Sequence, residues 1–205
     1  MEFINNTPVA SFIFIFTIVT SIYAFNDNSL FGKFMLNPYN VSRRYKIYTL
    51  ITSGLIHADW MHLIFNMITF FSFGFALEGM IGSINFGILY FVSLIVSDIP
   101  SVIKHKNDIW YNSLGASGAI SAVLFSYVLF QPFSRMYIMP IPVPIWAIVF
   151  GPLYLLYCVY AAKQSRDNIN HDAHFFGALS GMILTVLLVD NVIPNFIAKL
   201  LEKIG

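Results

Sequence analysis

The fourth apolar segment of this sequence reads GASGAISAVLFSYVLFQP, residues 115–132. Its apolar part covers 117–130, between a glycine-rich start and Gln131-Pro132. A helix that crosses a bilayer needs roughly 20 apolar residues, so this one is short for a full span. Because bare backbone in lipid is costly, neighbouring helices must cover it. The segment therefore predicts a membrane bundle that encloses one short helix.

The composition agrees with a membrane location. Of the 205 residues, 58% are hydrophobic, 17% aromatic and 10% charged, whereas a soluble domain carries about 25% charged residues. This excludes the soluble, disordered, collagen-like and disulfide-rich classes. The net charge of +1 lacks the excess of basic residues that is typical of nucleic-acid-binding proteins. The lone cysteine, Cys158, excludes an intrachain disulfide and a cysteine-built zinc site, and no cofactor is expected.

Six segments approach the length and hydrophobicity of membrane helices, which indicates an all-α integral membrane protein with a single domain over residues 1–205. Their expected bounds are 9–25, 60–77, 84–103, 117–130, 141–162 and 174–189. The polar stretch 26–56 has apolar residues at roughly helical spacing, so we expect this long loop to be partly structured. The first segment is long for a signal peptide and lacks a preceding basic residue, so we interpret it as a retained helix.

Polar residues inside membrane segments are costly and usually face the interior of the bundle. His62 and Asn66 are four residues apart in the second segment, and they share one face of its helix. His57 lies shortly before them. An imidazole and a carboxamide on one face provide two hydrogen-bond donors, although hydrogen bonding between helices would also explain them.

A serine lies between two glycines where the fourth segment begins. Gly115 and Gly118 let another backbone approach closely and leave the Ser117 hydroxyl accessible. Small residues are also frequent where membrane helices touch, so helix packing alone would explain this string.

The sixth segment carries a histidine on a stripe of small residues. His174, Gly177 and Gly181 share one helical face, and packing this face on the fourth segment would bring His174 towards Ser117. A serine beside a histidine is the arrangement of an activated nucleophile. In a six-helix chain the second, fourth and sixth helices begin on the same side of the membrane, so His62 joins them. Taken alone, His174 could equally be an interfacial histidine.

Together these strings resemble the rhomboid family of intramembrane serine proteases. The matching motifs are His57-x4-His62-x3-Asn66, Gly115-x-Ser117-Gly118 and Ala173-His174-x2-Gly177, in the family's order on a six-helix core. The resemblance implies a dyad in which Ser117 is the nucleophile and His174 the general base. It also implies an oxyanion hole of His62, Asn66 and the Ser117 backbone N–H. Supporting roles fall to Gly115, Gly118, Gly177 and Gly181 in close packing, and to His57 and Glu78 as structural residues.

Two departures from the family pattern stand out. Many members have a tyrosine four residues after the nucleophile that packs on the catalytic histidine. Here that position is Ser121, so something else must orient His174, or the dyad is looser. The Trp-Arg pair common in the first loop is replaced by Tyr48-Thr49. Asp172 is two residues from His174 and should face elsewhere on a helix, which argues against a triad acid.

The resemblance also implies partners and orientation. The substrates would be single-pass membrane proteins cut in or next to their spanning helix, and residues 163–172 would form a lid over the dyad.

The site would open to the extracytoplasmic side of a cell membrane. That orientation conflicts with the positive-inside rule. It puts three basic residues inside, Arg135, Lys199 and Lys203, and eight outside, Lys33, Arg43, Arg44, Lys46, Lys104, Lys106, Lys163 and Arg166. The sequence leaves the oligomeric state open.

Three rival interpretations remain. A rhomboid-like protein without proteolytic activity could bind membrane proteins or help extract them, although such relatives usually lack the serine and histidine. A transporter would explain Asp98, but no inverted repeat is evident. A metal site would use His57, His62, His171 and His174. It lacks a His-Glu-x-x-His string and a carboxylate at ligand spacing, so no metal is expected.

Overall fold

A computed structural model of the protein describes residues 5–138, 141–164 and 169–204. Within these residues, five helices are long and apolar enough to cross a membrane. They are α2 (Pro8–Asn26), α6 (Trp60–Ile81), α7 (Ser83–His105), α9 (Ala147–Gln164) and α10 (His171–Leu188). The shorter apolar helix α8 (Ser117–Phe130) completes the bundle. The predicted all-α membrane fold is confirmed.

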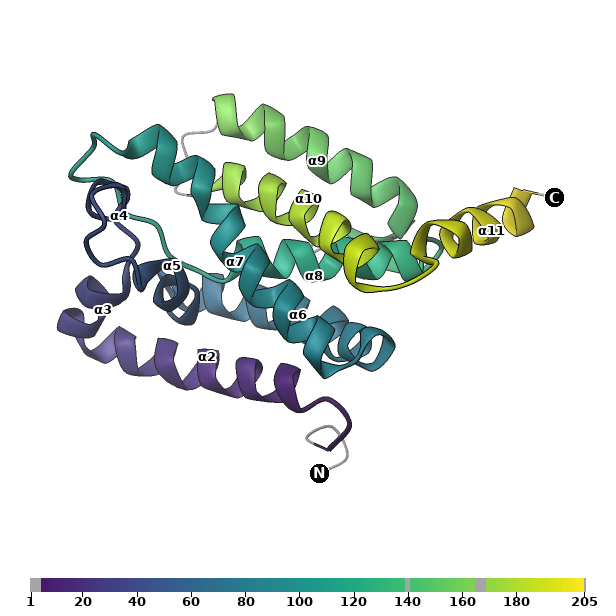
Figure 1. The fold of residues 1–205 in the computed structure, drawn as a ribbon, viewed down its shortest axis with the longest axis horizontal. Coiled ribbons are helices and arrows are strands. Elements are labelled where there is room, and N and C mark those ends of the chain that lie inside the picture. The colour runs from purple at the N-terminus through teal and green to yellow at the C-terminus, as the bar shows by residue number, and fades with distance from the viewer. Residues whose placement is uncertain (1–4, 139–140, 165–168, 205) are drawn as a thin grey trace.

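Helix α8 lies in the middle of this bundle, against α10, α7 and α6, while α2 and α9 occupy opposite edges (Figure 1). Residues 118–126 of α8 are all buried, as is Val128. The helix has 14 residues, too few for a bilayer that needs roughly 20. Its neighbours therefore provide the cover that a short helix requires in lipid.

Glycines bring α8 and α10 into backbone contact. A Cβ placed on Gly177 would overlap the carbonyl oxygen of Gly118, and one on Gly181 would overlap that of Ala122. A Cβ on Gly118 itself would overlap the Ser97 hydroxyl of α7. Only residues without a side chain permit such close approach. This packing fixes the depth at which α8 and α10 begin relative to each other.

The stretch between α2 and α6 is folded, as expected. It contains α3 (Asn28–Phe34), α4 (Pro38–Ser42), α5 (Thr49–Thr52) and the short 3-10 helix η1 (Ser53–Leu55). Asp27 caps α3 by accepting hydrogen bonds from two backbone N–H groups, and Asn37 caps α4 in the same way.

This stretch is also fastened to the loop between α7 and α8. Leu36 and Ser113 exchange two backbone hydrogen bonds of 2.9 Å. The Asn37 side chain donates to the carbonyl oxygens of Ile109 and Tyr111. Backbone groups that would otherwise need water are thereby paired, and the loop that leads into α8 is held in place.

The expected helix over 141–162 is wrong at its start. Strand β1 (Arg135–Ile138) pairs antiparallel with β2 (Ile141–Trp146), and α9 begins only at Ala147. Pro142 and Pro144 explain the difference, since proline lacks an N–H and the residue before it disfavours helical backbone. The apolar run misled the sequence interpretation because a hairpin and a helix can be equally hydrophobic.

Other differences lie at the helix ends and after the last expected segment, and α6 continues to Ile81, four residues beyond its expected end. Helix α10 begins at His171, three residues before the expected start, because the Asn170 side chain caps it by accepting from the Ala173 N–H. An unexpected helix, α11 (Val192–Ile204), extends away from the bundle (Figure 1). Its residues Ile193, Ile197 and Leu201 are exposed and follow one another at four-residue spacing. They give α11 an apolar face of the kind that lies along a membrane surface.

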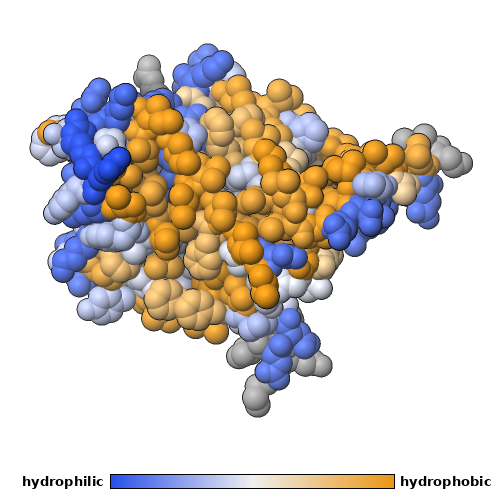
Figure 2. Space-filling model, viewed as in Figure 1, coloured by the Kyte–Doolittle hydropathy of each residue, from blue (hydrophilic) through white to orange (hydrophobic). Residues whose placement is uncertain are grey.

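The surface supports the same placement. Figure 2 shows a broad apolar face over the bundle, with hydrophilic residues gathered at the end that carries α3, α4 and α5. Large exposed apolar side chains on the spanning helices include Phe12, Phe71, Leu156 and Leu187. Such a patch would be costly in water and is suited to lipid.

Candidate active site

The first group of polar residues is positioned by the start of α6. Asp59 caps this helix, and its carboxylate accepts a 2.8 Å hydrogen bond from the His62 backbone N–H. This places His62 in the first turn and Asn66 one turn further along the same face. His62 is half-buried and Asn66 is 7% exposed.

The His62 ring lies against the loop that leads to Ser117. A Cβ on Gly115 would come within 2.6 Å of the ring, and Gly115 has φ +112°, a backbone conformation that favours glycine. The Ala58 N–H points at His62 Nδ1 at 3.5 Å. With Nδ1 as acceptor, the neutral ring carries its hydrogen on Nε2. Nε2 is the atom that would lie 2.8 Å from the added Cβ, so it is a donor beside the 115–117 turn.

Asn66 has an unused donor. Among the residues that the structure describes, its buried Nδ2 has no hydrogen-bond partner, which costs free energy unless a ligand supplies an acceptor. Ser117 adds a second donor, because it is the first residue of α8 and a helix leaves its first N–H groups without an intrahelical acceptor. N–H donors of this kind are what stabilises a negatively charged oxygen.

The start of α10 is held by a second network. The Asn170 Nδ2 donates to Ser101 Oγ at 2.8 Å and to Ser113 Oγ at 3.2 Å. It therefore ties α10 to α7 and to the loop before α8. The Ala173 carbonyl oxygen lies 3.3 Å from a Cβ placed on Gly118. Ser117 directly precedes Gly118 and His174 directly follows Ala173, so both lie near the same level of the α8–α10 contact.

The residue that orients His174 was missed by the sequence interpretation. Tyr154 of α9 directs its hydroxyl at His174, 3.1 Å from Nδ1, and the two rings are nearly parallel, with an interplanar angle of 13° and centroids 6.4 Å apart. The same hydroxyl is 3.4 Å from Ser121 Oγ. Ser121 was the signal that a partner had to come from elsewhere. No spacing rule could identify Tyr154, because it lies on a different helix.

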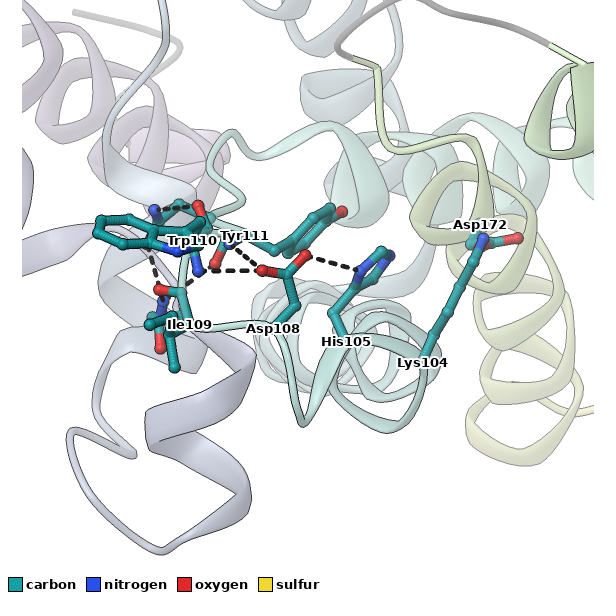
Figure 3. A network of polar contacts seen from close by, with 9 residues as sticks. Lys104, His105, Asp108, Ile109, Trp110, Tyr111 and Asp172 are labelled. Atoms are coloured by element: carbon teal, nitrogen blue, oxygen red, sulfur yellow. Dashed lines mark hydrogen bonds and ion pairs between the residues drawn. The ribbon is translucent and has the colours of Figure 1, made fainter.

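Asp172, which the sequence disfavoured as a triad acid, forms an ion pair with a lysine of α7. Its carboxylate is 2.9 Å from Lys104 Nζ at the end of α7, and Figure 3 shows the two side chains meeting there. The nearby 105–111 loop is compact, with His105 stacked on Tyr111 at 3.7 Å between ring centroids. The expected lid over 163–172 includes residues 165–168, which lie outside the described part of the chain.

His57 and Glu78 are both buried in contacts between helices. His57 is fully buried, its Nδ1 is 3.0 Å from Ser21 Oγ, and its ring packs edge-on against that of His62. Burial, together with the neighbouring His62, lowers the pKa of His57 to about 3. Glu78 accepts hydrogen bonds from the Val9 and Ala10 N–H groups and so joins the far end of α6 to the start of α2. Both contacts hold helices together.

These features define a multi-pass helical membrane protein with a polar site enclosed between its helices. The protein-family model of the Rhomboid domain matches residues 44–191 of the sequence. The chain belongs to the rhomboid family, as the sequence motifs predicted.

Relatives support this membership. The Bacillus subtilis protein YdcA, named provisionally as a rhomboid protease, is 34% identical over 142 residues, covering 68% of this chain and 66% of that protein. Rhomboid protein 1, mitochondrial, of Saccharomyces cerevisiae is 29% identical, covering 66% of this chain and 40% of its own length. Rhomboid protease GluP of B. subtilis is 29% identical over 68% of this chain and 25% of its own length. The chain thus spans less than half the length of the last two.

Proposed function

We propose that this protein is an intramembrane serine endopeptidase in which Ser117 is the nucleophile and His174 the general base. The observation that carries the proposal is the glycine contact between α8 and α10, which sets Ser117 and His174 at one level. Family membership supports the reaction class.

The chemistry follows from the donors around Ser117. His174 takes the hydroxyl proton through Nε2 as Ser117 attacks the carbonyl carbon of a peptide bond. In that tautomer Nδ1 carries a hydrogen and donates it to the Tyr154 oxygen, which holds the ring in place. His62 Nε2–H, Asn66 Nδ2 and the Ser117 N–H then stabilise the tetrahedral oxyanion. Water hydrolyses the acyl-enzyme, and His174 returns the proton.

The substrates are single-pass transmembrane proteins cut in or next to their spanning helix. A polar site enclosed by lipid-facing helices receives chains from the bilayer more readily than soluble peptides, and the exposed apolar faces keep the enzyme in lipid. We place the site at the extracytoplasmic face of a cell membrane. Gly115, Gly118, Gly177 and Gly181 support the site through close packing.

The test is cleavage of a model single-pass substrate by the reconstituted protein, run in parallel with labelling by a mechanism-based serine probe. S117A and H174A should each lose at least about a thousandfold in activity, as when a member of a catalytic dyad is removed. The matched control is S126A, because Ser126 is a buried serine further along α8 whose hydroxyl donates to the Ala122 carbonyl of its own helix.

The rival function is a rhomboid-like protein that binds membrane proteins without cutting them. Under that function the wild type neither cleaves nor takes up the probe, and S117A binds a substrate as well as the wild type does. Probe labelling without cleavage would instead mean that the substrate was unsuitable.

A further inference from the structure

Three metal-ligating side chains converge beside the proposed dyad. Cys158 of α9 and His171 and His174 of α10 have their Sγ and ring nitrogen atoms within 4.8 Å of one another. Cys158 is fully buried and His171 is 4% exposed, whereas His174 is half-buried and forms the accessible edge of the cluster. The lone cysteine excluded a cysteine-built site from the sequence, but the fold supplies two more ligands from a neighbouring helix.

The geometry fits a small divalent cation. Three atoms 4.8 Å apart lie about 2.8 Å from their common centre, and zinc binds sulfur at about 2.3 Å and nitrogen at about 2.0 Å. Each ligand atom therefore needs to move by less than about 1 Å, which side-chain rotation provides. A thiolate with two imidazoles and no carboxylate suits zinc rather than magnesium or calcium. Three protein ligands leave the fourth position to water.

We propose that Cys158, His171 and His174 bind a zinc ion, and that the bound ion switches the protease off. Binding displaces one proton, from the Cys158 thiol, to solvent. A neutral imidazole has one lone pair, and a metal on either His174 nitrogen takes it while the other nitrogen carries hydrogen. His174 then cannot accept the Ser117 proton. The inhibitory part of this inference rests on the proposed function, whereas the binding part does not.

Tyr154 affects the zinc concentration at which the protease is switched off. Its hydroxyl lies 3.1 Å from His174 Nδ1, so it competes with a metal for that nitrogen. In the zinc-free protein, Tyr154 holds the ring for catalysis. In the zinc-bound protein, the ring is held by the ion instead. The same histidine thus has two alternative partners, one active and one inactive.

Cobalt is the direct probe of binding, because tetrahedral Co²⁺ bound to a thiolate gives a near-ultraviolet charge-transfer band. The chain contains one cysteine, so any such band must come from Cys158. The full-length protein in detergent, titrated with Co²⁺, should give this band together with visible absorption. Zn²⁺ should displace the cobalt and abolish both. C158S, which keeps the size of the side chain, should show neither. A folded wild type without a thiolate band would overturn the proposal.

The activity arm uses the same proteins in zinc-buffered assays. Zinc should inhibit the wild type, and a chelator should restore it fully. C158S and H171N should cleave at the wild-type rate without metal and need at least about 100-fold more zinc for half inhibition, since even losing a second-shell partner costs 10–100-fold in affinity. Equal inhibition of wild type and C158S would overturn the switch. No cleavage by chelator-treated wild type would count against the protease, while the cobalt band would still decide the metal site.

Discussion

At the scale of single residues, Tyr154 is the most informative side chain of the site. Its ring is nearly parallel to that of His174, and its hydroxyl lies 3.1 Å from Nδ1. In the serine–histidine pair the base must keep Nε2 free for the nucleophile, so an acceptor at Nδ1 fixes the useful tautomer. A neutral phenol from α9 can do this without a third carboxylate. It also accounts for Ser121, where many family members have a tyrosine.

Removing only the Tyr154 hydroxyl should slow the reaction without weakening substrate binding. Y154F keeps the ring and loses a hydrogen bond worth about 1 kcal/mol, so kcat should fall roughly fivefold while KM stays unchanged. Labelling by a serine probe should slow in parallel. The control is Y160F, because Tyr160 is an exposed tyrosine of the same helix. A purely structural role would instead lower the melting temperature of Y154F and leave kcat per folded molecule intact.

His57 makes the folded state sensitive to acid. Its pKa is about 3 in the folded protein because it is buried, against about 6.5 in an unfolded chain. Below pH 6.5 His57 is protonated in the unfolded state but not in the folded state. Its contribution to the free energy of unfolding is therefore fully present above pH 6.5 and is lost as the pH falls towards 3. Melting temperatures in detergent should fall between pH 7.5 and 5, and less steeply in H57N. Parallel curves for both proteins would rule this explanation out.

At the scale of helices, the contact between α8 and α10 positions the site. Gly177 faces the Gly118 carbonyl and Gly181 faces the Ala122 carbonyl. Backbones at this distance gain van der Waals contact along their length, which is the main source of helix association in lipid. A shift of one helix along the other would separate Ser117 from His174 while leaving both residues intact.

A methyl group in this contact should therefore damage stability and activity together. G181A would place a Cβ inside the Ala122 backbone, and overpacking of this kind costs about 1–3 kcal/mol. The melting temperature should drop by several degrees and the cleavage rate should fall. G79A is the matched control, because a Cβ on this exposed helical glycine meets nothing within 4 Å. It should be neutral or slightly stabilising. Equal effects of the two variants would refute the close contact.

At the scale of the whole molecule, the family resemblance and the distribution of basic residues indicate opposite orientations in the membrane. In the proposed orientation the site opens away from the cytoplasm, and most lysines and arginines then lie on that same side. Several of these charges are engaged in folded structure. Arg43 donates to the Lys106 carbonyl and packs on Tyr39, and Lys104 pairs with Asp172. The positive-inside rule counts basic residues in short loops near the helix ends, so these charges still count, and they disagree with the proposed orientation.

Labelling of single cysteines in intact cells should resolve this conflict. In a C158A background, W110C lies at an 84% exposed position beside the start of α8, and E202C lies on exposed α11 beyond the opposite end of the bundle. A membrane-impermeant maleimide should label W110C in intact cells and E202C only after lysis. The reverse pattern would establish that the site opens to the cytoplasm, as the positive-inside rule indicates.

Much of this protein could be predicted from its sequence. In lipid an apolar segment of roughly 20 residues spans as a helix, because a barrel strand is only about 9–11 residues long, so composition and segment length were enough for the membrane bundle. The spacing of His62 and Asn66 placed them on one face, since helical periodicity is local. The short α8 and its need for cover also followed. The hairpin before α9 did not, because hydrophobicity alone cannot distinguish a strand from a helix.

Only the tertiary structure decided which residues from different helices meet. Tyr154 and Cys158 lie on α9, and nothing in their local sequence shows that they face His174. The rotation of α9 about its axis is set by packing against α8 and α10, and that packing sums many weak contacts along the whole helix. Spacing along the chain determines the partners within a helix. Partners across helices depend on how the finished bundle packs.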